Sequence, residues 1–189
     1  MRDKIISVII LICLCVTGCA HTRKPPPLVL EPNKYSYTFS VPKGWDFSFE
    51  QANESNMRLV FFPVGGNVHL SESVIYVNEV RGNLDNAFDI MLGNAKAHNP
   101  LLRIEPIDAI PLTWNPGVSA PVRILTGAND PRQAKEALVF IDHGTMVVLV
   151  VLTTKNTANW REDYRALETV VAGHKYFDCN SPHLAVPCR

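Results

Sequence analysis

The chain has 189 residues, in which 18 Lys and Arg residues balance 18 Asp and Glu residues. This length allows one domain with a sizeable core. Because no charge of one sign dominates, the chain is not expected to attract nucleic acid or an anionic bilayer, and nucleic acid is excluded as a partner.

The N-terminus has the composition of a secretory signal. Two basic residues, Arg2 and Lys4, precede an apolar run over residues 5–16. A membrane-spanning helix needs about 20 apolar residues, and this run has roughly a dozen. We therefore expect residues 1–18 to be a cleaved signal peptide.

The end of this segment, Val16-Thr17-Gly18-Cys19-Ala20, looks like the lipobox of a bacterial lipoprotein. Small residues let a peptidase approach the backbone, and the Cys19 thiol would be alkylated by lipid. An ordinary cleaved signal and an uncleaved anchor are the alternatives. Lipoprotein maturation usually adds three acyl chains, such as palmitate, and two or more hold a protein firmly on a membrane. Ala20, in place of an aspartate, favours the outer membrane, with the domain facing the periplasm.

Residues 19–34 are predicted to form a tether behind the lipid. They include Pro25, Pro26, Pro27 and Pro32 and show no hydrophobic period. Such a segment is semi-stiff and reaches about 3.1 Å per residue where it is polyproline II. A disordered leader without particular reach is the alternative.

Beyond the tether, apolar and polar residues alternate in several short runs, which is typical of strands with one buried face. The two most apolar runs are joined at residues 142–144 and are predicted to form the central hairpin. The expected strands are 35–41, 45–49, 57–62, 74–80, 102–107, 122–126, 137–141 and 146–153.

Two segments have helical spacing instead. Residues 84–95 follow a predicted N-cap at Asn83 and precede the breaker Pro100. Residues 160–171 form the second helix, for which Asn159 has capping-box spacing and Gly173 is placed at the end. The sequence therefore predicts an α+β fold with a mainly antiparallel sheet of about six to eight strands flanked by two helices.

The strand-turn-aromatic segment over residues 37–45, the helix after the first strands, the late hairpin and the closing helix together resemble the PsbP-like (PsbP and DcrB-type) fold. The resemblance covers residues 35–177 and implies an α/β/α sandwich. Members of that family act mainly as accessory or binding proteins, which implies a non-enzymatic module. The matching residues are structural, so no functional residue carries over.

The tail over residues 178–189 contains Cys179 and Cys188. In an oxidising exported compartment these two thiols are predicted to form a disulfide. Free thiols are one alternative. A metal site with His183 is another, but two cysteines and one histidine fall short of a structural zinc set.

No motif for catalysis, metal or cofactor binding was found, and no cofactor is expected. His69, His98 and His143 have no catalytic or metal-binding partner at the sequence spacing of a known motif. Two aromatic side chains, Trp45 and Trp114, are the candidate binding surface, although Trp114 could also fold back on the core. The segments 62–71 and 111–117 are where a site would be sought.

Three functions remain open. The preferred one is a membrane-anchored accessory or binding module for an envelope protein or complex. The second is a carrier that holds a small apolar ligand between sheet and helix, which requires a cavity. The third is a hydrolase, which requires a nucleophile close to one of the three histidines.

Overall fold

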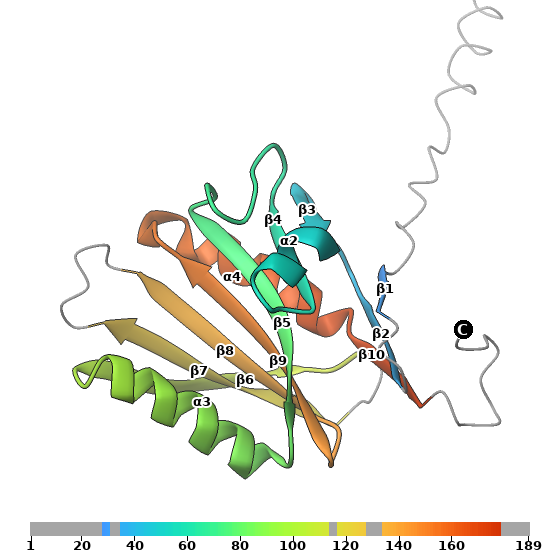
Figure 1. Cartoon of the computed structure of the whole chain (residues 1–189), viewed down its shortest axis with the longest axis vertical. Helices are drawn as coiled ribbons and strands as arrows, with labels where there is room; N and C mark the ends of the chain where they lie inside the picture. Colours follow the sequence, from blue (N-terminus) through green and yellow to red (C-terminus); the bar gives the residue numbers. More distant parts are fainter. Residues whose placement is uncertain (1–27, 31–34, 114–116, 128–133, 179–189) are drawn as a thin grey trace, which may run out of the picture.

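The computed structural model describes residues 28–30, 35–113, 117–127 and 134–178. The strands form two antiparallel sheets (Figure 1). The larger sheet has seven strands in the order β3 (Trp45–Ser48), β4 (Leu59–Pro63), β5 (Ser73–Arg81), β9 (Met146–Thr154), β8 (Lys135–Asp142), β7 (Ser119–Gly127) and β6 (Leu102–Pro111). The smaller sheet has the order β1 (Leu28–Leu30), β2 (Tyr35–Phe39) and β10 (Lys175–Asp178).

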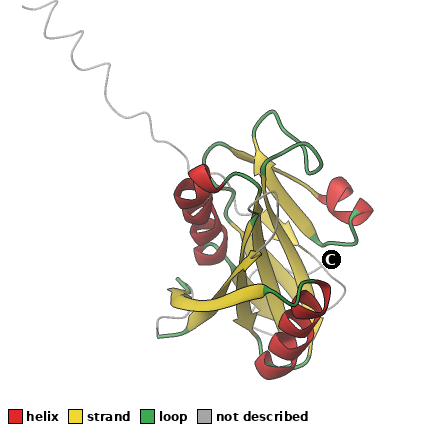
Figure 2. Cartoon of the chain, turned by 90° about the vertical axis from the view of Figure 1, so that its left-hand side faces the viewer, coloured by secondary structure: helices red, strands yellow, loops and turns green. Residues whose placement is uncertain are grey.

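Helices lie on both sides of the larger sheet (Figure 2). They are α2 (Phe49–Glu54), α3 (Leu84–His98) and α4 (Trp160–Ala172), and a short 3-10 turn, η1 (Thr157–Asn159), precedes α4. The α+β prediction, with an antiparallel sheet of six to eight strands, is confirmed. The predicted central hairpin is also present, because β9 is the fourth of the seven strands and pairs with β8.

The face of the sheet that carries α4, here called the α4 face, holds the larger core. Alternate residues of the central strands point to this side, so Ile75 of β5 and Val150 of β9 are both fully buried. From α4, Leu167 and Val171 pack into the same cluster. This contact explains the helical spacing in residues 160–171. A helix with one buried face needs apolar residues at every third or fourth position.

The opposite face of the sheet, here called the α3 face, is covered in two parts. Helix α3 packs on β7, β8 and β9 through residues such as Ala87 and Phe88. Helix α2 packs over β4 and β5, where Ala52 contacts a small cluster that includes Val60. Tyr76 of β5 contacts both groups. This face is therefore divided between two covers rather than closed by one.

The prediction of two helices is corrected by α2. The expected strand over 45–49 ends at Ser48, whose hydroxyl accepts a hydrogen bond from the backbone N–H of Gln51 at 3.1 Å. Ser48 is therefore the N-cap of α2, and Phe49 lies in the helix. A serine followed three residues later by glutamine is a capping-box pattern, which marked the start of this helix in the sequence.

The two predicted helices differ in their caps. In α3, Asn83 accepts a hydrogen bond from the N–H of Asn86 at 3.0 Å, as predicted. In α4, Asn159 occupies the N-cap position, as predicted, but its side chain makes no capping hydrogen bond. Asn156 instead accepts from the N–H of Ala158 and starts η1, which leads directly into α4.

Gly173 ends α4, as predicted, but not through a left-handed conformation, since its φ is −80°. The chain just after β2 passes very close to it: a side-chain carbon at Gly173 would lie 2.7 Å from the backbone nitrogen of Ser40. Glycine is therefore required at this position by the close approach of Ser40 to the end of α4.

Three strand residues lie in the range assigned to the tether, because Leu28–Leu30 pair with β2. A run of three apolar residues is too short to show a period of two. Strand β10 was also not predicted, and it pairs with β2 on the other side. Among the described residues, no helix is long and apolar enough to cross a membrane.

Candidate functional site

The loop over residues 64–72 follows β4 and lies beside α2. We call α2 and this loop together the α2–loop surface. The side chain of Asn67 accepts hydrogen bonds from the N–H groups of His69 and Leu70, at 3.0 and 2.9 Å. The side chain of Gln51 in α2 accepts from the N–H of Val68 at 2.8 Å. These bonds hold the loop in one conformation and attach it to α2.

The α2–loop surface presents apolar side chains to solvent. Leu70 is 80% exposed and Val64 is 67% exposed, and Phe49 of α2 is also exposed. Isolated exposed apolar residues are common, but here Val64 and Leu70 lie in one short loop, and Phe49 lies in the helix to which a side-chain hydrogen bond attaches that loop. The segment 62–71, in which a site was sought from the sequence, contains two of the three.

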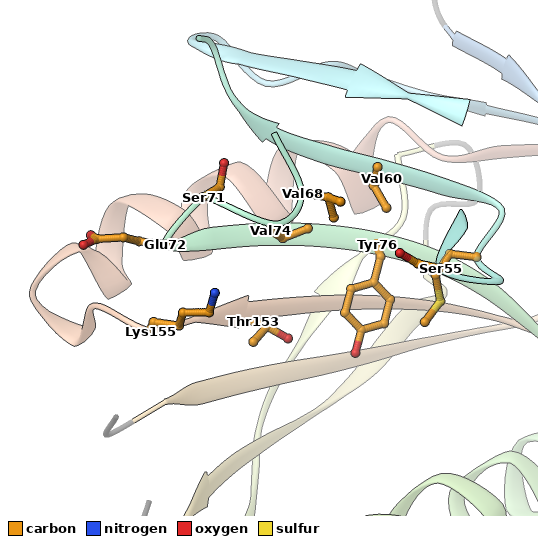
Figure 3. A pocket seen from close by; sticks show the side chains of 10 residues that line it. Ser55, Val60, Val68, Ser71, Glu72, Val74, Tyr76, Thr153 and Lys155 are labelled. Carbon is orange, nitrogen blue, oxygen red and sulfur yellow. The ribbon is translucent and has the colours of Figure 1, made fainter. Parts of the chain in front are cut away.

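A pocket of about 270 Å³ lies against the α2–loop surface on the α3 face of the sheet (Figure 3). Its sheet side consists of Val60, Val74 and Tyr76. The remaining lining comes from Met57 and Val68 on the α2–loop side, and from Ser55, Ser71, Glu72, Thr153 and Lys155. The pocket thus has an apolar part beside α2 and a polar part at the end of β9.

The polar part of the pocket includes the hydroxyl groups of Thr153 and Tyr76. The hydroxyl of Thr153 donates to the carboxylate of Glu136 at 3.0 Å. Burial, with the charge of Glu136 as a second cause, raises the pKa of the Tyr76 phenol to about 12. Tyr76 is therefore a neutral hydrogen-bonding group at neutral pH and not a nucleophile.

At the end of the pocket, Glu72 immediately before β5 lies opposite Lys155 immediately after β9. The backbone N–H of Lys155 donates to the carbonyl of Glu72 at 2.8 Å. The carboxylate of Glu72 accepts from the side-chain amide of Asn156 at 2.9 Å. Among the described residues, Lys155 is in no ion pair.

A second polar cluster joins two histidines at the far end of α4. The Nε2 atoms of His143 and His174 are 3.0 Å apart. His174 is fully buried, with its ring centroid 5.0 Å from that of Phe39. Burial lowers the pKa of His143 to about 4, and burial with the charge of His143 lowers the pKa of His174 to about 3. Both imidazoles are neutral at neutral pH, and one donates to the other.

A third cluster is buried between α4 and the sheet. The hydroxyl of Ser73 donates to the carboxylate of Asp163 at 2.5 Å and lies 2.8 Å from the hydroxyl of Thr154. Burial raises the pKa of Asp163, although the two hydroxyl groups partly oppose the shift. These three side chains are buried, so we assign them to the attachment of α4 and not to a ligand site.

Of the candidate residues predicted from the sequence, Trp45 lies in the described part of the structure. Trp45 is half-buried against the core of the α4 face. Four other candidates, Cys19, Trp114, Cys179 and Cys188, lie outside the described residues.

The described histidines have contacts that give the hydrolase hypothesis no support. His69 lies 3.9 Å from a carboxylate oxygen of Glu54, and His98 bonds the carbonyl of Asn94 in its own helix. His143 contacts His174, which sequence reasoning missed because only the fold brings residues 143 and 174 together. Within the described residues, no group of three or more His, Cys, Asp or Glu side chains could hold a metal ion.

No family model matches the chain, and no curated protein matches it either. Among solved structures, the chain is similar to the cyanobacterial PsbP protein CyanoP of Synechocystis sp. PCC 6803, with 13% identity, a TM-score of 0.46 and coverage of 86% of this chain and 99% of that one. It is also similar to LpqN of Mycobacterium tuberculosis, which is involved in cell envelope biogenesis, with 14% identity, a TM-score of 0.49 and coverage of 80% and 90%. The Saccharomyces cerevisiae Ran-binding protein Mog1p gives 10% identity, a TM-score of 0.46 and coverage of 79% and 95%. At these values the likeness assigns neither a family nor an activity to this chain.

Proposed function

We propose that this chain is a bacterial envelope lipoprotein, anchored through lipid on Cys19, whose PsbP-like domain is a non-enzymatic binding module for an envelope protein. The partner docks on the α2–loop surface. The observation that carries this proposal is the exposure of Leu70 and Val64 on a loop that is already held in one conformation.

A rigid loop with exposed apolar residues suits protein binding for an energetic reason. A loop that is already ordered loses little conformational freedom when a partner binds, so more of the contact energy appears as affinity. Residues that dominate binding are commonly apolar anchors surrounded by polar groups. Leu70 fits this description, because it follows His69, whose imidazole lies 3.9 Å from the carboxylate of Glu54.

The anchor accounts for where this module acts. Lipid on Cys19 with a proline-rich tether would hold the domain close to a membrane, and the absence of Asp at residue 20 favours the outer membrane. Cys179 and Cys188 would then lie in an oxidising compartment and form a disulfide. Cys19→Ser tests the anchor: we expect an unlipidated form that is no longer processed after Gly18. Normal processing and membrane retention of this variant would refute the anchor.

Docking can be tested by crosslinking in intact cells. A photoreactive amino acid at residue 70 should give one discrete crosslinked product, whose partner is identified by mass spectrometry. The matched control is the same amino acid at Ile90 of α3, which is 42% exposed on a different surface.

A photoreactive residue at Val64 should capture the same partner, and Leu70→Asp in that protein should abolish the capture. Equal capture from residue 90, or capture from residue 64 that survives Leu70→Asp, would contradict docking at the α2–loop surface.

A further inference from the structure

The pocket beside the α2–loop surface has a feature that protein docking does not explain. The ammonium group of Lys155 points toward Val74 and Thr153, whereas the carboxylate of Glu72 points away from them (Figure 3). The two residues are of opposite charge and lie opposite each other beside the ends of β5 and β9, yet their side chains do not pair with each other. The ammonium group of Lys155 therefore faces the pocket without forming an ion pair with Glu72.

A hydrogen bond to Glu72 explains why its carboxylate is separated from the ammonium group of Lys155. The side-chain amide of Asn156 donates to the Glu72 carboxylate at 2.9 Å, so this carboxylate is held at the edge of the pocket and not against Lys155. Lys155 has no carboxylate within 4.0 Å among the described residues. A lysine without an ion pair at the mouth of a mostly apolar pocket can bind an anionic group.

The rest of the pocket fixes the other properties of a ligand. Val60, Val68 and Val74 provide aliphatic contacts, with Met57 beside them. The volume of about 270 Å³ is below the ~300 to 1,000 Å³ of pockets for drug-sized ligands. Glu136, which Thr153 bonds, would repel an anion that moved along β8. The anionic group is thus confined to the Lys155 end, and the apolar part extends toward Met57.

We propose that this pocket binds a small aliphatic carboxylate, with the carboxylate at Lys155 and the aliphatic chain against the three valines. A short fatty acid has this chemistry. The proposal does not depend on docking at the α2–loop surface, since the ligand would occupy the sheet side of the loop and Leu70 does not line the pocket.

The test uses the full chain with Cys19→Ser, titrated with octanoate and followed by amide chemical shifts. We expect saturable shifts at Val68, Val74 and Lys155. The neutral isostere 1-octanol should bind more weakly, because it cannot pair with the ammonium group. Lys155→Met keeps the aliphatic stem and should weaken octanoate binding about tenfold, as is typical for loss of a charge-assisted hydrogen bond.

Two further variants serve as controls for folding and for the site. Lys43→Met removes an exposed lysine that does not line the pocket and should leave octanoate binding unchanged. Val68→Trp fills the pocket from the loop and should abolish binding while the melting temperature stays close to that of the parent. Lys155→Gln replaces Lys155→Met if the latter does not fold.

Three outcomes would overturn the proposal. The first is no saturable shift with octanoate. The second is equal binding of octanoate and octanol, or an unchanged affinity in the Lys155 variant. The third is binding of a peptide that ends in leucine but not of octanoate, which would assign the pocket to a protein partner.

Discussion

The two faces of the larger sheet differ in how completely their helices close them. On the α4 face, five residues of α4 are buried, Leu167 and Val171 among them. On the α3 face, Ala87 is the one buried residue of α3, and a pocket lies against the α2–loop surface. Side chains of the larger sheet alternate between its two faces. One face forms a closed core, and the other keeps an accessible surface.

Because the two faces differ in burial, the α4 face contributes more to stability and the α3 face is more accessible for binding. Burial of apolar area is the main favourable term in folding, and it is concentrated at the α4 face. Partly buried side chains of the α3 face, such as Met91 and Leu92, contribute less to stability and remain available for contact. Substitutions on the two faces should therefore have different consequences.

The largest expected effect is at the α4 face. Leu167→Ala removes a fully buried side chain and should lower the free energy of unfolding by about 2–5 kcal/mol. Leu92→Ala on the α3 face should cost about 1 kcal/mol, because Leu92 is only partly buried. Urea denaturation of both variants measures the difference. Equal losses would show that α3 is as important for stability as α4.

The second effect is acid sensitivity at the end of α4. Since His143 and His174 have folded-state pKa values of about 4 and about 3, below the unfolded value of 6.5, the unfolded chain binds more protons below that value. Stability should therefore fall between about pH 6.5 and pH 4, by on the order of 2–5 kcal/mol at pH 4.5. Thermal unfolding across this range measures it.

The matched variants for acid sensitivity are His143→Gln and His98→Gln. The first removes one of the paired imidazoles and should reduce the slope of stability against pH on the acid side. The second replaces an exposed histidine and should leave the slope unchanged. An identical slope in His143→Gln and the parent would show that the pair is not the source.

A smaller effect is expected from the buried cluster beneath α4. Asp163→Ala removes the carboxylate that accepts from the Ser73 hydroxyl, leaves Thr154 as the partner of that hydroxyl, and should cost about 1–3 kcal/mol. The double variant Asp163→Ala with Ser73→Ala should recover part of that loss, because neither partner is then buried alone. A double-mutant cycle by denaturation provides the test, and purely additive losses would argue against coupling of the two side chains.

The smallest effect on stability is expected at the α2–loop surface. Leu70→Asp changes an exposed side chain and should alter the free energy of unfolding by no more than about 0.5 kcal/mol. The same variant should lose the proposed partner. A change above 2 kcal/mol would mean that Leu70 has a structural role instead.

Sequence patterns predicted most of the elements but not the short ones. The runs that became β5, β8, β9 and α3 were long enough for their periods to be read. By contrast, Phe49 continued the alternation of Trp45 and Phe47, so the change to helix after Ser48 was hidden although the capping residues were present. Strand β1 is three residues long, and no period can be read from three residues.

The site was predictable only where it is local in sequence. The segment 62–71 was identified as a place to search, and it contains Val64, Val68 and Leu70. Lys155 could not be assigned to the same place, because its position beside Glu72 depends on the antiparallel pairing of β5 and β9. The contact between His143 and His174 likewise depends on tertiary structure alone.

The short strand β1 has a mechanical consequence. If Cys19 carries lipid, a load on the tether reaches the domain at Leu28, where β1 pairs with β2 and, among the described strands, with no other. A load applied there would separate the three residue pairs of β1 one after another, beginning at Leu28 and Phe39. Each released residue would extend the tether by roughly 3.3 Å. The domain could thus move farther from the membrane under tension while its seven-stranded sheet stayed folded.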